Sequence, residues 1–263
     1  MTSRRAALSV YDSMTSKLIA RFAALTMGWL AAAGSAAPGS AGENPKAVVE
    51  LFTSQGCSSC PPADRVLAEL AREADVIALS LPVDYWDYLG WKDTLASPAF
   101  SARQRAYSNA RGDRQVFTPQ MIVNGKISCV GSDRAQIGRS MARASAGSDR
   151  LPVRIELAEN GPMLTIDVGG ASPPATGEVW VLPVVKAREV AIGRGENRGR
   201  SVTYANVVRG MTRAGYWSGA PARLEVPLKK ARHGEADSYV VLLQEGDPEK
   251  PGSILGAAKG PGL

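Results

Sequence analysis

The sequence predicts a mixed α/β domain followed by an all-β, sandwich-like domain, with an export signal ahead of both. Three observations carry this prediction. Residues 46–81 alternate a short apolar run, a helical pattern and a second apolar run, which is typical of parallel strands joined by a helix. From residue 150 onward, apolar residues recur at every second position, the period of half-buried strands. Residues 1–41 have the composition of a signal peptide.

The first 41 residues are expected to be removed on export. An apolar run over 22–33 is too short to span a bilayer, which takes about 20 residues, and small residues follow it, so cleavage is expected near Ala37 or Ala41. Removal takes away Asp12 and four basic residues and lowers the formal charge from +6 to +3. The mature chain is therefore expected in the periplasm or secreted, without a stable membrane span and without nucleic acid as a partner. The four basic residues are Arg4, Arg5, Lys17 and Arg21.

The first predicted domain, residues 46–147, begins with two strands joined by a helix. Residues 47–52 and 76–81 are short and nearly all apolar, as expected of central strands covered on both faces. Between them, small and apolar side chains recur at helical spacing from Cys60 to Ala74, which gives the helix one apolar face.

Two further helices and a hairpin complete this domain. Ser97 and Pro98 form a cap and first-turn pair that predicts a helix to about Ala110. Asn124 and Gly125 lie between two apolar runs and predict a tight β-hairpin. A final helix follows the hairpin.

Cys57 and Cys60 lie at the expected start of the first helix, near Ser58. Unpartnered backbone N–H groups and the positive end of the helix dipole would favour a thiolate at Cys57, which predicts this residue as a nucleophile. Cys60 is close enough to attack a mixed disulfide at Cys57, which is the resolving role. Pro61 and Pro62 fit a first helical turn, where no intrahelical N–H bond is lost.

Other chemistry for this pair is open. The cysteines could form a plain stabilising disulfide, as expected in an oxidising compartment. A zinc site or metal delivery is disfavoured, because Cys129 and His233 are the only other soft ligands in the chain. Cys129 itself is expected to be a small buried strand residue. We therefore expect neither a metal nor a cofactor.

Glu50 interrupts the first predicted strand. Strand alternation places it on the same face as Val48 and Phe52, and we expect it to point beneath the cysteine turn and relay protons to and from Cys60. The alternative is a carboxylate paired with a Lys or Arg at a strand edge.

An aromatic insertion follows the second strand. Tyr85, Trp86, Tyr88 and Trp91 fall within seven positions, a density that predicts a partner-binding wall. The alternative is a local mini-core that holds the insertion in place.

The order of these elements resembles the thioredoxin fold over residues 46–146. More narrowly, three stretches resemble the DUF1223 family of secreted bacterial proteins: ELFTSQGCSSCPPAD at 50–64, VDYWDYLGWKD at 83–93 and TPQ at 118–120. The resemblance implies that Cys57 attacks and Cys60 resolves. It further implies that Pro119, after Thr118, is a cis-proline that faces the pair and presents backbone to a substrate chain.

The second predicted domain, residues 150–263, is expected to be a two-sheet sandwich. Its strands are expected near 153–157, 164–168, 178–186, 201–208, 223–228, 238–244 and 254–258. The loop 193–200 is rich in glycine and arginine and could bind an anion, although such a run is also typical of a solvated hairpin loop.

The sequence thus predicts an exported thiol-disulfide oxidoreductase acting through Cys57 and Cys60 on a protein thiol or disulfide of the cell envelope. The alternative is a non-catalytic envelope binding or assembly module in which the Cys-x-x-Cys disulfide is structural.

Overall fold

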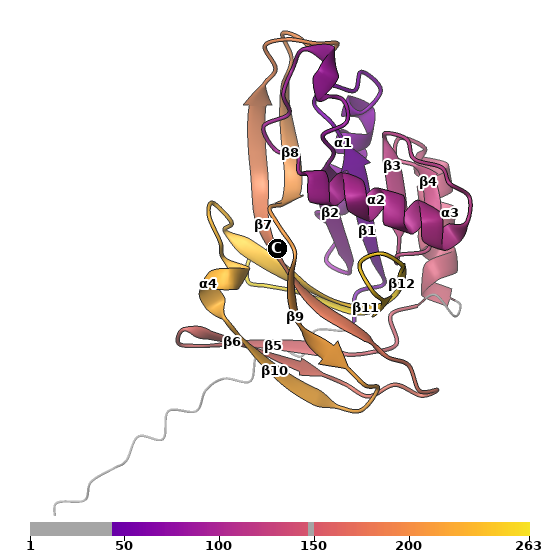
Figure 1. The fold of residues 1–263 in the computed structure, drawn as a ribbon, viewed down its shortest axis with the longest axis vertical. Coiled ribbons are helices and arrows are strands. Elements are labelled where there is room, and N and C mark those ends of the chain that lie inside the picture. Colours follow the sequence, from indigo (N-terminus) through magenta and orange to yellow (C-terminus); the bar gives the residue numbers. More distant parts are fainter. Residues whose placement is uncertain (1–43, 147–149) are drawn as a thin grey trace, which may run out of the picture. The chain divides into compact units, whose positions relative to one another are not determined.

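The computed structural model describes residues 44–146 and 150–263 (Figure 1). The predicted signal peptide lies outside the described residues. Within them, no helix is long and apolar enough to cross a membrane. The elements up to residue 146 are β1 (Ala47–Thr53), α1 (Pro61–Leu70), β2 (Val76–Pro82), the 3-10 helix η1 (Asp87–Leu89), α2 (Pro98–Arg111), β3 (Gln120–Val123), β4 (Ile127–Val130) and α3 (Arg134–Ala146).

From residue 150 onward the chain is almost entirely β-structure. The elements are β5 (Ile155–Asn160), β6 (Met163–Val168), β7 (Gly177–Ala191), β8 (Ser201–Val208), β9 (Thr212–Trp217), β10 (Ala222–Pro227), the short helix α4 (Leu228–Ala231), β11 (Ser238–Gly246) and β12 (Pro251–Lys259).

Local signals in the first half predict its elements well. Ser97 caps α2 by accepting a hydrogen bond from the Ala99 amide, and Pro98 is the first helical residue. Asn124 and Gly125 both have positive φ, at 46° and 75°, as a tight hairpin turn requires. The strands β1 and β2 are parallel, and β3 pairs with both β1 and β4 in antiparallel fashion.

One nine-stranded sheet includes strands from both halves of the chain. Its order is β12-β11-β7-β8-β2-β1-β3-β4, with β9 also paired to β7. The two halves join where β8 lies parallel to β2, at Ser80 and Val207, and the Asn206 side chain donates to the Ala78 carbonyl at 2.9 Å. The expectation of a separate sandwich after residue 150 therefore needs correction, because β7 and β8 extend the sheet of the α/β half.

Two-sheet packing does occur at the far end of this sheet. A three-stranded sheet, β10-β6-β5, packs its apolar side chains against those of β7, β11 and β12. The strand β7 has 15 residues, or about 50 Å at 3.3 Å per residue. Its first half pairs with β9 and β11 and its second half with β8, so one strand belongs both to the sandwich and to the α/β sheet.

The strand β1 is buried at every position and has helices on both faces. Val49 and Leu51 pack with residues of α1 and α3. Val48 and Phe52 pack with residues of α2, which crosses in front of β1 and β2 in Figure 1. Alternate side chains of β1 therefore point toward α1 and toward α2. The face on which a polar residue of β1 lies decides which helix surrounds it.

Because the two halves share one sheet, the full chain should unfold in a single cooperative transition. Calorimetric and van't Hoff enthalpies should agree for the oxidised protein. Val207→Ala, at the fully buried junction of β8 with β2, should lower the free energy of unfolding by about 1 to 3 kcal/mol and keep one transition. Two resolved transitions would instead show that the halves fold independently.

Candidate functional site

Cys57 and Cys60 form a disulfide in the turn between β1 and α1, with their Cα atoms 5.4 Å apart. The Cys60 amide donates to the Cys57 carbonyl at 3.2 Å, and the amides of Ala63 and Asp64 donate to the Cys60 carbonyl at 2.8 and 3.1 Å. The helix α1 begins at Pro61, with Cys60 as its N-cap, and not near Ser58 as expected.

Because α1 starts at Pro61, fewer backbone amides are available to stabilise a thiolate at Cys57. Pro61 and Pro62 have no N–H, and the next two amides of the first turn are bonded to Cys60. The first turn of α1 therefore offers no free N–H group to Cys57, and only the helix dipole remains of the electrostatic argument made from the sequence.

The disulfide is buried although it lies in a loop. Cys57 is 1% exposed and Cys60 is 0% exposed, whereas Ser58 and Ser59 between them are exposed. The aromatic insertion and the β7–β8 hairpin both bond to the loop that carries it, and the segment at Pro119 lies near the first turn of α1.

The aromatic insertion holds the loop that precedes Cys57. The Trp91 indole Nε1 donates to Gln55 Oε1 at 2.8 Å, and the Gln55 amide donates to Asp93 Oδ2 at 2.8 Å. Asp93 also accepts from the amides of Leu95 and Ala96, and burial raises the pKa of this carboxyl. The insertion thus fixes the backbone of the cysteine loop.

Trp86 connects the cysteine loop to the proline segment. Its indole Nε1 donates to Thr118 Oγ1 at 2.7 Å, and the peptide bond from Thr118 to Pro119 is cis, as the resemblance implied. A Cβ on Gly56 would lie 3.0 Å from the Trp86 Cβ, so only glycine allows this close approach. Trp86 therefore touches both segments that the sequence singled out.

Pro119 itself lies near the first turn of α1. A Cβ added to Gly131 would lie 3.2 Å from the Cβ atoms of both Pro119 and Ala63, so Gly131 lets the proline segment approach the cysteine helix. The Tyr85 hydroxyl donates to Gln104 of α2, and the ring lies beside Trp86 at a centroid distance of 6.3 Å. Tyr85 and Trp86 are thus half-buried groups that also pack on the core, and Trp86 contacts the cysteine loop.

The tip of the β7–β8 hairpin, residues 192–200, is the part of the site that the sequence did not predict. Asn197 is buried and its Nδ2 donates to the carbonyls of Gln55 and Cys57, at 2.9 and 2.8 Å. Glu196 Oε2 accepts from the Ser58 amide at 3.2 Å. Figure 1 shows β7 and β8 extending beside β2 toward this end of the molecule. The segment is the largely exposed hairpin loop that one reading of the sequence predicted, and its buried Asn197 also bonds it to the cysteine loop.

Asp64 is a second residue that sequence reasoning missed. It lies one helical turn after Cys60, is 3% exposed, and accepts a hydrogen bond at Oδ1 from the Thr53 hydroxyl at 2.7 Å. Its Oδ2 has no hydrogen-bond partner among the described residues. Burial raises the pKa of this carboxyl to about 7, and the nearby Asp93 carboxylate adds to the effect. The available signal was its i+4 spacing from Cys60, which puts it on the buried face of α1.

Glu50 does not occupy the place expected of it. Its carboxylate accepts from Arg103 Nε at 2.7 Å, from Arg103 Nη2 at 3.2 Å and from the Tyr107 hydroxyl at 2.5 Å, and Arg103 Nη2 also donates to Gln244. These partners lie on the α2 face of β1, whereas the cysteine helix covers the other face. The proposed relay from Glu50 to Cys60 is therefore wrong, and the alternative of an arginine pair is correct, in the core instead of at an edge.

The third cysteine takes no part in the site. Cys129 is 2% exposed on β4, with Sγ 3.7 Å from the Met121 carbonyl oxygen, and burial raises the pKa of its thiol to about 11. It is the small buried strand residue that was expected. Across residues 44–146 and 150–263, no three His, Cys, Asp or Glu side chains gather in a way that could hold a metal ion.

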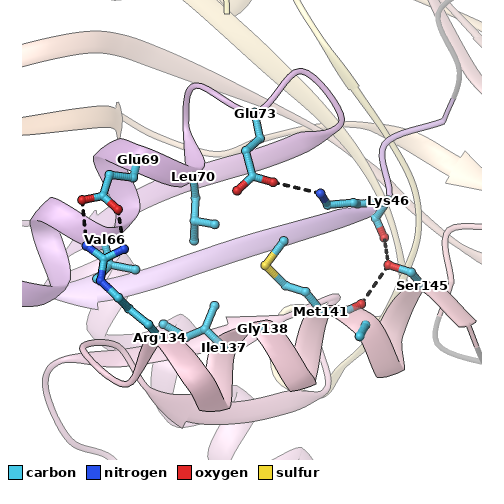
Figure 2. A pocket seen from close by; sticks show the side chains of 11 residues that line it. Lys46, Val66, Glu69, Leu70, Glu73, Arg134, Ile137, Gly138, Met141 and Ser145 are labelled. Atoms are coloured by element: carbon cyan, nitrogen blue, oxygen red, sulfur yellow. Dashed lines mark hydrogen bonds and ion pairs between the residues drawn. The ribbon is translucent and has the colours of Figure 1, made fainter.

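A separate groove of about 510 Å³ lies between α1 and α3 (Figure 2). Its apolar floor contains Val66, Leu70, Ile137 and Met141. Ion pairs cross its rim, from Lys46 to Glu73 at 2.8 Å and from Arg134 to Glu69. Neither cysteine and none of the predicted site residues lines it.

Fold and site together define an α/β protein with a buried Cys-x-x-Cys disulfide just ahead of a helix. The chain belongs to the DUF1223 family, described as "Protein of unknown function (DUF1223)", whose model matches residues 48–244. The match crosses residue 150 and includes the β7–β8 hairpin, so the family signature extends over both halves of the chain.

Solved structures and a curated relative resemble the chain to different extents. The crystal structure of protein AGR_C_4864 from Agrobacterium tumefaciens is 34% identical, with a TM-score of 0.76, over 85% of this chain and 97% of that one. HBP35 of Porphyromonas gingivalis has a similar fold, with a TM-score of 0.55 and 12% identity, over 83% of this chain and 75% of that one. A "Probable Thioredoxin" of Archaeoglobus fulgidus is 43% identical over 37 residues, which are 14% of this chain and 41% of that relative.

Replacing Glu50 with Gln should destabilise the protein without changing the reactivity of the disulfide. The change leaves the buried Arg103 guanidinium without its counter-charge, at a cost of about 3 to 5 kcal/mol in the free energy of unfolding by urea. The double change Glu50→Gln and Arg103→Met removes both charges and should recover part of this loss. Slower or faster reduction of the disulfide in a folded Glu50→Gln protein would restore a redox role for Glu50.

The Asp64 carboxyl should make stability depend on pH between about 4 and 7. The folded protein holds this proton more tightly than the unfolded chain, so its stabilising contribution is complete below the unfolded pKa of about 3.9 and is lost as pH rises to about 7. Relative to Asp64→Asn, the free energy of unfolding of the wild type should fall as pH rises, by about 1.4 kcal/mol for each unit by which the pKa is raised. Above the folded pKa the difference should stay constant. Urea unfolding from pH 4 to 8 measures the difference, with Glu69→Gln as the exposed control. Parallel pH profiles for wild type and Asp64→Asn would contradict the assignment.

Proposed function

We propose that this protein is a thiol-disulfide oxidoreductase with a thioredoxin-like site, in which Cys57 exchanges with a partner and Cys60 resolves. The observation that carries the proposal is the meeting of three features: a Cys-x-x-Cys disulfide ahead of α1, a cis-proline at residue 119, and the side chain of Trp86, which contacts both segments. The order β1-α1-β2-α2-β3-β4-α3, with a parallel and then an antiparallel neighbour for β1, matches that of the thioredoxin fold. The 37-residue likeness to a probable thioredoxin supports the same conclusion.

The exchange proceeds in two displacement steps. A partner thiolate attacks Cys57 Sγ, the bond to Cys60 breaks, and Cys60 leaves as a thiolate that takes up a proton. The partner's second thiolate then attacks the partner sulfur that is bonded to Cys57, and Cys57 leaves as a thiolate. The partner is thereby oxidised by two electrons to a disulfide, and the cysteine pair is reduced. The reverse sequence oxidises the pair. No cofactor enters either direction, and the partner is a thiol or disulfide protein of the cell envelope.

Asp64 is the group best placed to supply the proton that Cys60 needs. It follows Cys60 by one helical turn, it is buried, and its pKa of about 7 keeps it partly protonated at neutral pH. It takes the role that the sequence assigned to Glu50, from the face of β1 that the cysteine helix covers. The pH titration of Asp64→Asn measures whether it holds this proton.

A structural disulfide is the second candidate function. The burial of both sulfur-bearing residues and the absence of free amides in the first turn of α1 favour this alternative. In that case the β strands of the second half would dock an envelope partner, and the cysteines would only close the turn.

Trapping of mixed disulfides separates the two functions. Cys60→Ser removes the resolving thiol and should accumulate mixed disulfides between Cys57 and partner proteins, whereas Cys57→Ser should accumulate none. Both changes are made in a Cys129→Ser background, because Cys129 is buried and its loss leaves the pair intact. Non-reducing gels and mass spectrometry of the trapped species give the readout. Equal trapping by both variants, or by neither, would contradict the division of roles.

A further inference from the structure

The hairpin tip, residues 192–200, lies on the loop that carries the sulfur a partner must reach. Cys57 is 1% exposed, and the tip lies directly over its loop through the two hydrogen bonds from Asn197 and the one accepted by Glu196. Gly193 and Gly195 complete the contact, since a Cβ at either position would lie 3.1 to 3.4 Å from Trp91. A partner that reaches Cys57 therefore comes close to the residues of the tip.

The outer surface of the same tip is basic. Arg194, Arg198 and Arg200 are exposed, and none of them forms an ion pair with a described residue. The tip's own acid, Glu196, has one carboxylate oxygen engaged by the Ser58 amide on the cysteine loop. A partner that approaches Cys57 consequently meets several unpaired guanidinium groups. Arginine forms bidentate hydrogen bonds with carboxylates, so this surface fits a partner with acidic residues.

We propose that the hairpin tip is the partner-recognition element of the cysteine site and that it selects thiol or disulfide proteins carrying acidic residues beside the reacting cysteine. The inference rests on the proposed exchange function. Complementary charge speeds association by raising the local concentration of the partner, and the effect falls as salt screens it. Contact with the arginines also brings the partner to Asn197. Breaking its two hydrogen bonds to the cysteine loop would free the tip and make Cys57 more accessible.

Two synthetic dithiol peptides test the selection. Each carries a reduced Cys-x-x-Cys segment, flanked by glutamates in one peptide and by lysines in the other. Each peptide reduces the Cys57–Cys60 disulfide and is itself oxidised, and alkylation followed by mass spectrometry gives both rates. The quantity compared between protein variants is the ratio of the acidic to the basic rate, because the intrinsic reactivity of each peptide cancels from that comparison.

The tip variant Arg194→Ala with Arg198→Ala should lower this ratio about 3- to 10-fold at low salt. The control variant Arg139→Ala with Arg143→Ala loses the same charge from exposed positions of α3 and should leave the ratio unchanged. A ratio in the tip variant equal to that of wild type would overturn the inference while leaving the exchange function in place. Absence of reduction by either peptide in the folded wild type would overturn the exchange function and the inference with it.

Asn197→Ala tests the covering role independently of charge. Loss of the two hydrogen bonds should free the tip and raise the rate at which uncharged dithiothreitol reduces the disulfide, by about 3-fold or more, with the melting temperature recorded alongside. A folded Asn197→Ala protein that is reduced at the wild-type rate would show that the tip does not limit access to Cys57, and would overturn the inference.

Discussion

The arrangement of the whole molecule depends on the contact between β8 and β2. Without it, the two halves would still share an apolar core, in which Val48 and Phe52 of β1 cluster with Val184 of β7 and Leu242 of β11, but their strands would not form one sheet. With it, the strand β7 continues from the sandwich into the α/β sheet, and the hairpin that it forms with β8 reaches the cysteine loop. The Asn206 side chain strengthens this junction by donating to the Ala78 carbonyl on β2. One strand pairing thus unites the sheet and also assembles the site.

Two of the buried acids, Glu50 on β1 and Asp64 on α1, show how the environment determines the protonation of a carboxyl group. Glu50 faces α2 and is surrounded by the guanidinium of Arg103 and the hydroxyl of Tyr107, so its charge is matched in place. Asp64 faces the cysteine side with one hydroxyl donor and one oxygen without a partner, so burial acts against its charged form. The first acid is ion-paired within the core, and the pKa of the second is raised to about 7.

Features that depend on local sequence were predictable, and those that depend on distant contacts were not. The N-terminal cap of α2, the hairpin turn at Asn124 and the burial of Cys129 follow from residues within a few positions of each other. The cis bond before Pro119 followed from resemblance alone. By contrast, Asn197 meets the Cys57 carbonyl across 140 positions of sequence, and no local pattern marks that contact. The face that Glu50 shares with Val48 and Phe52 was predicted correctly, but its place beneath the cysteine turn was not, since strand alternation says which residues share a face but not which helix covers it.

The two prolines that open α1 have a consequence for the direction in which the cysteine pair can drive exchange. A helix that directs free amides at an attacking sulfur stabilises the thiolate, and a stabilised reduced form makes a disulfide a strong oxidant. Pro61 and Pro62 remove two of those donors, and Cys60 engages the next two. The reduced form gains little from the helix, so the balance shifts toward the disulfide. Under the proposed exchange function, such a pair is better suited to donate electrons to a partner than to withdraw them, provided that another thiol system returns it to the reduced state.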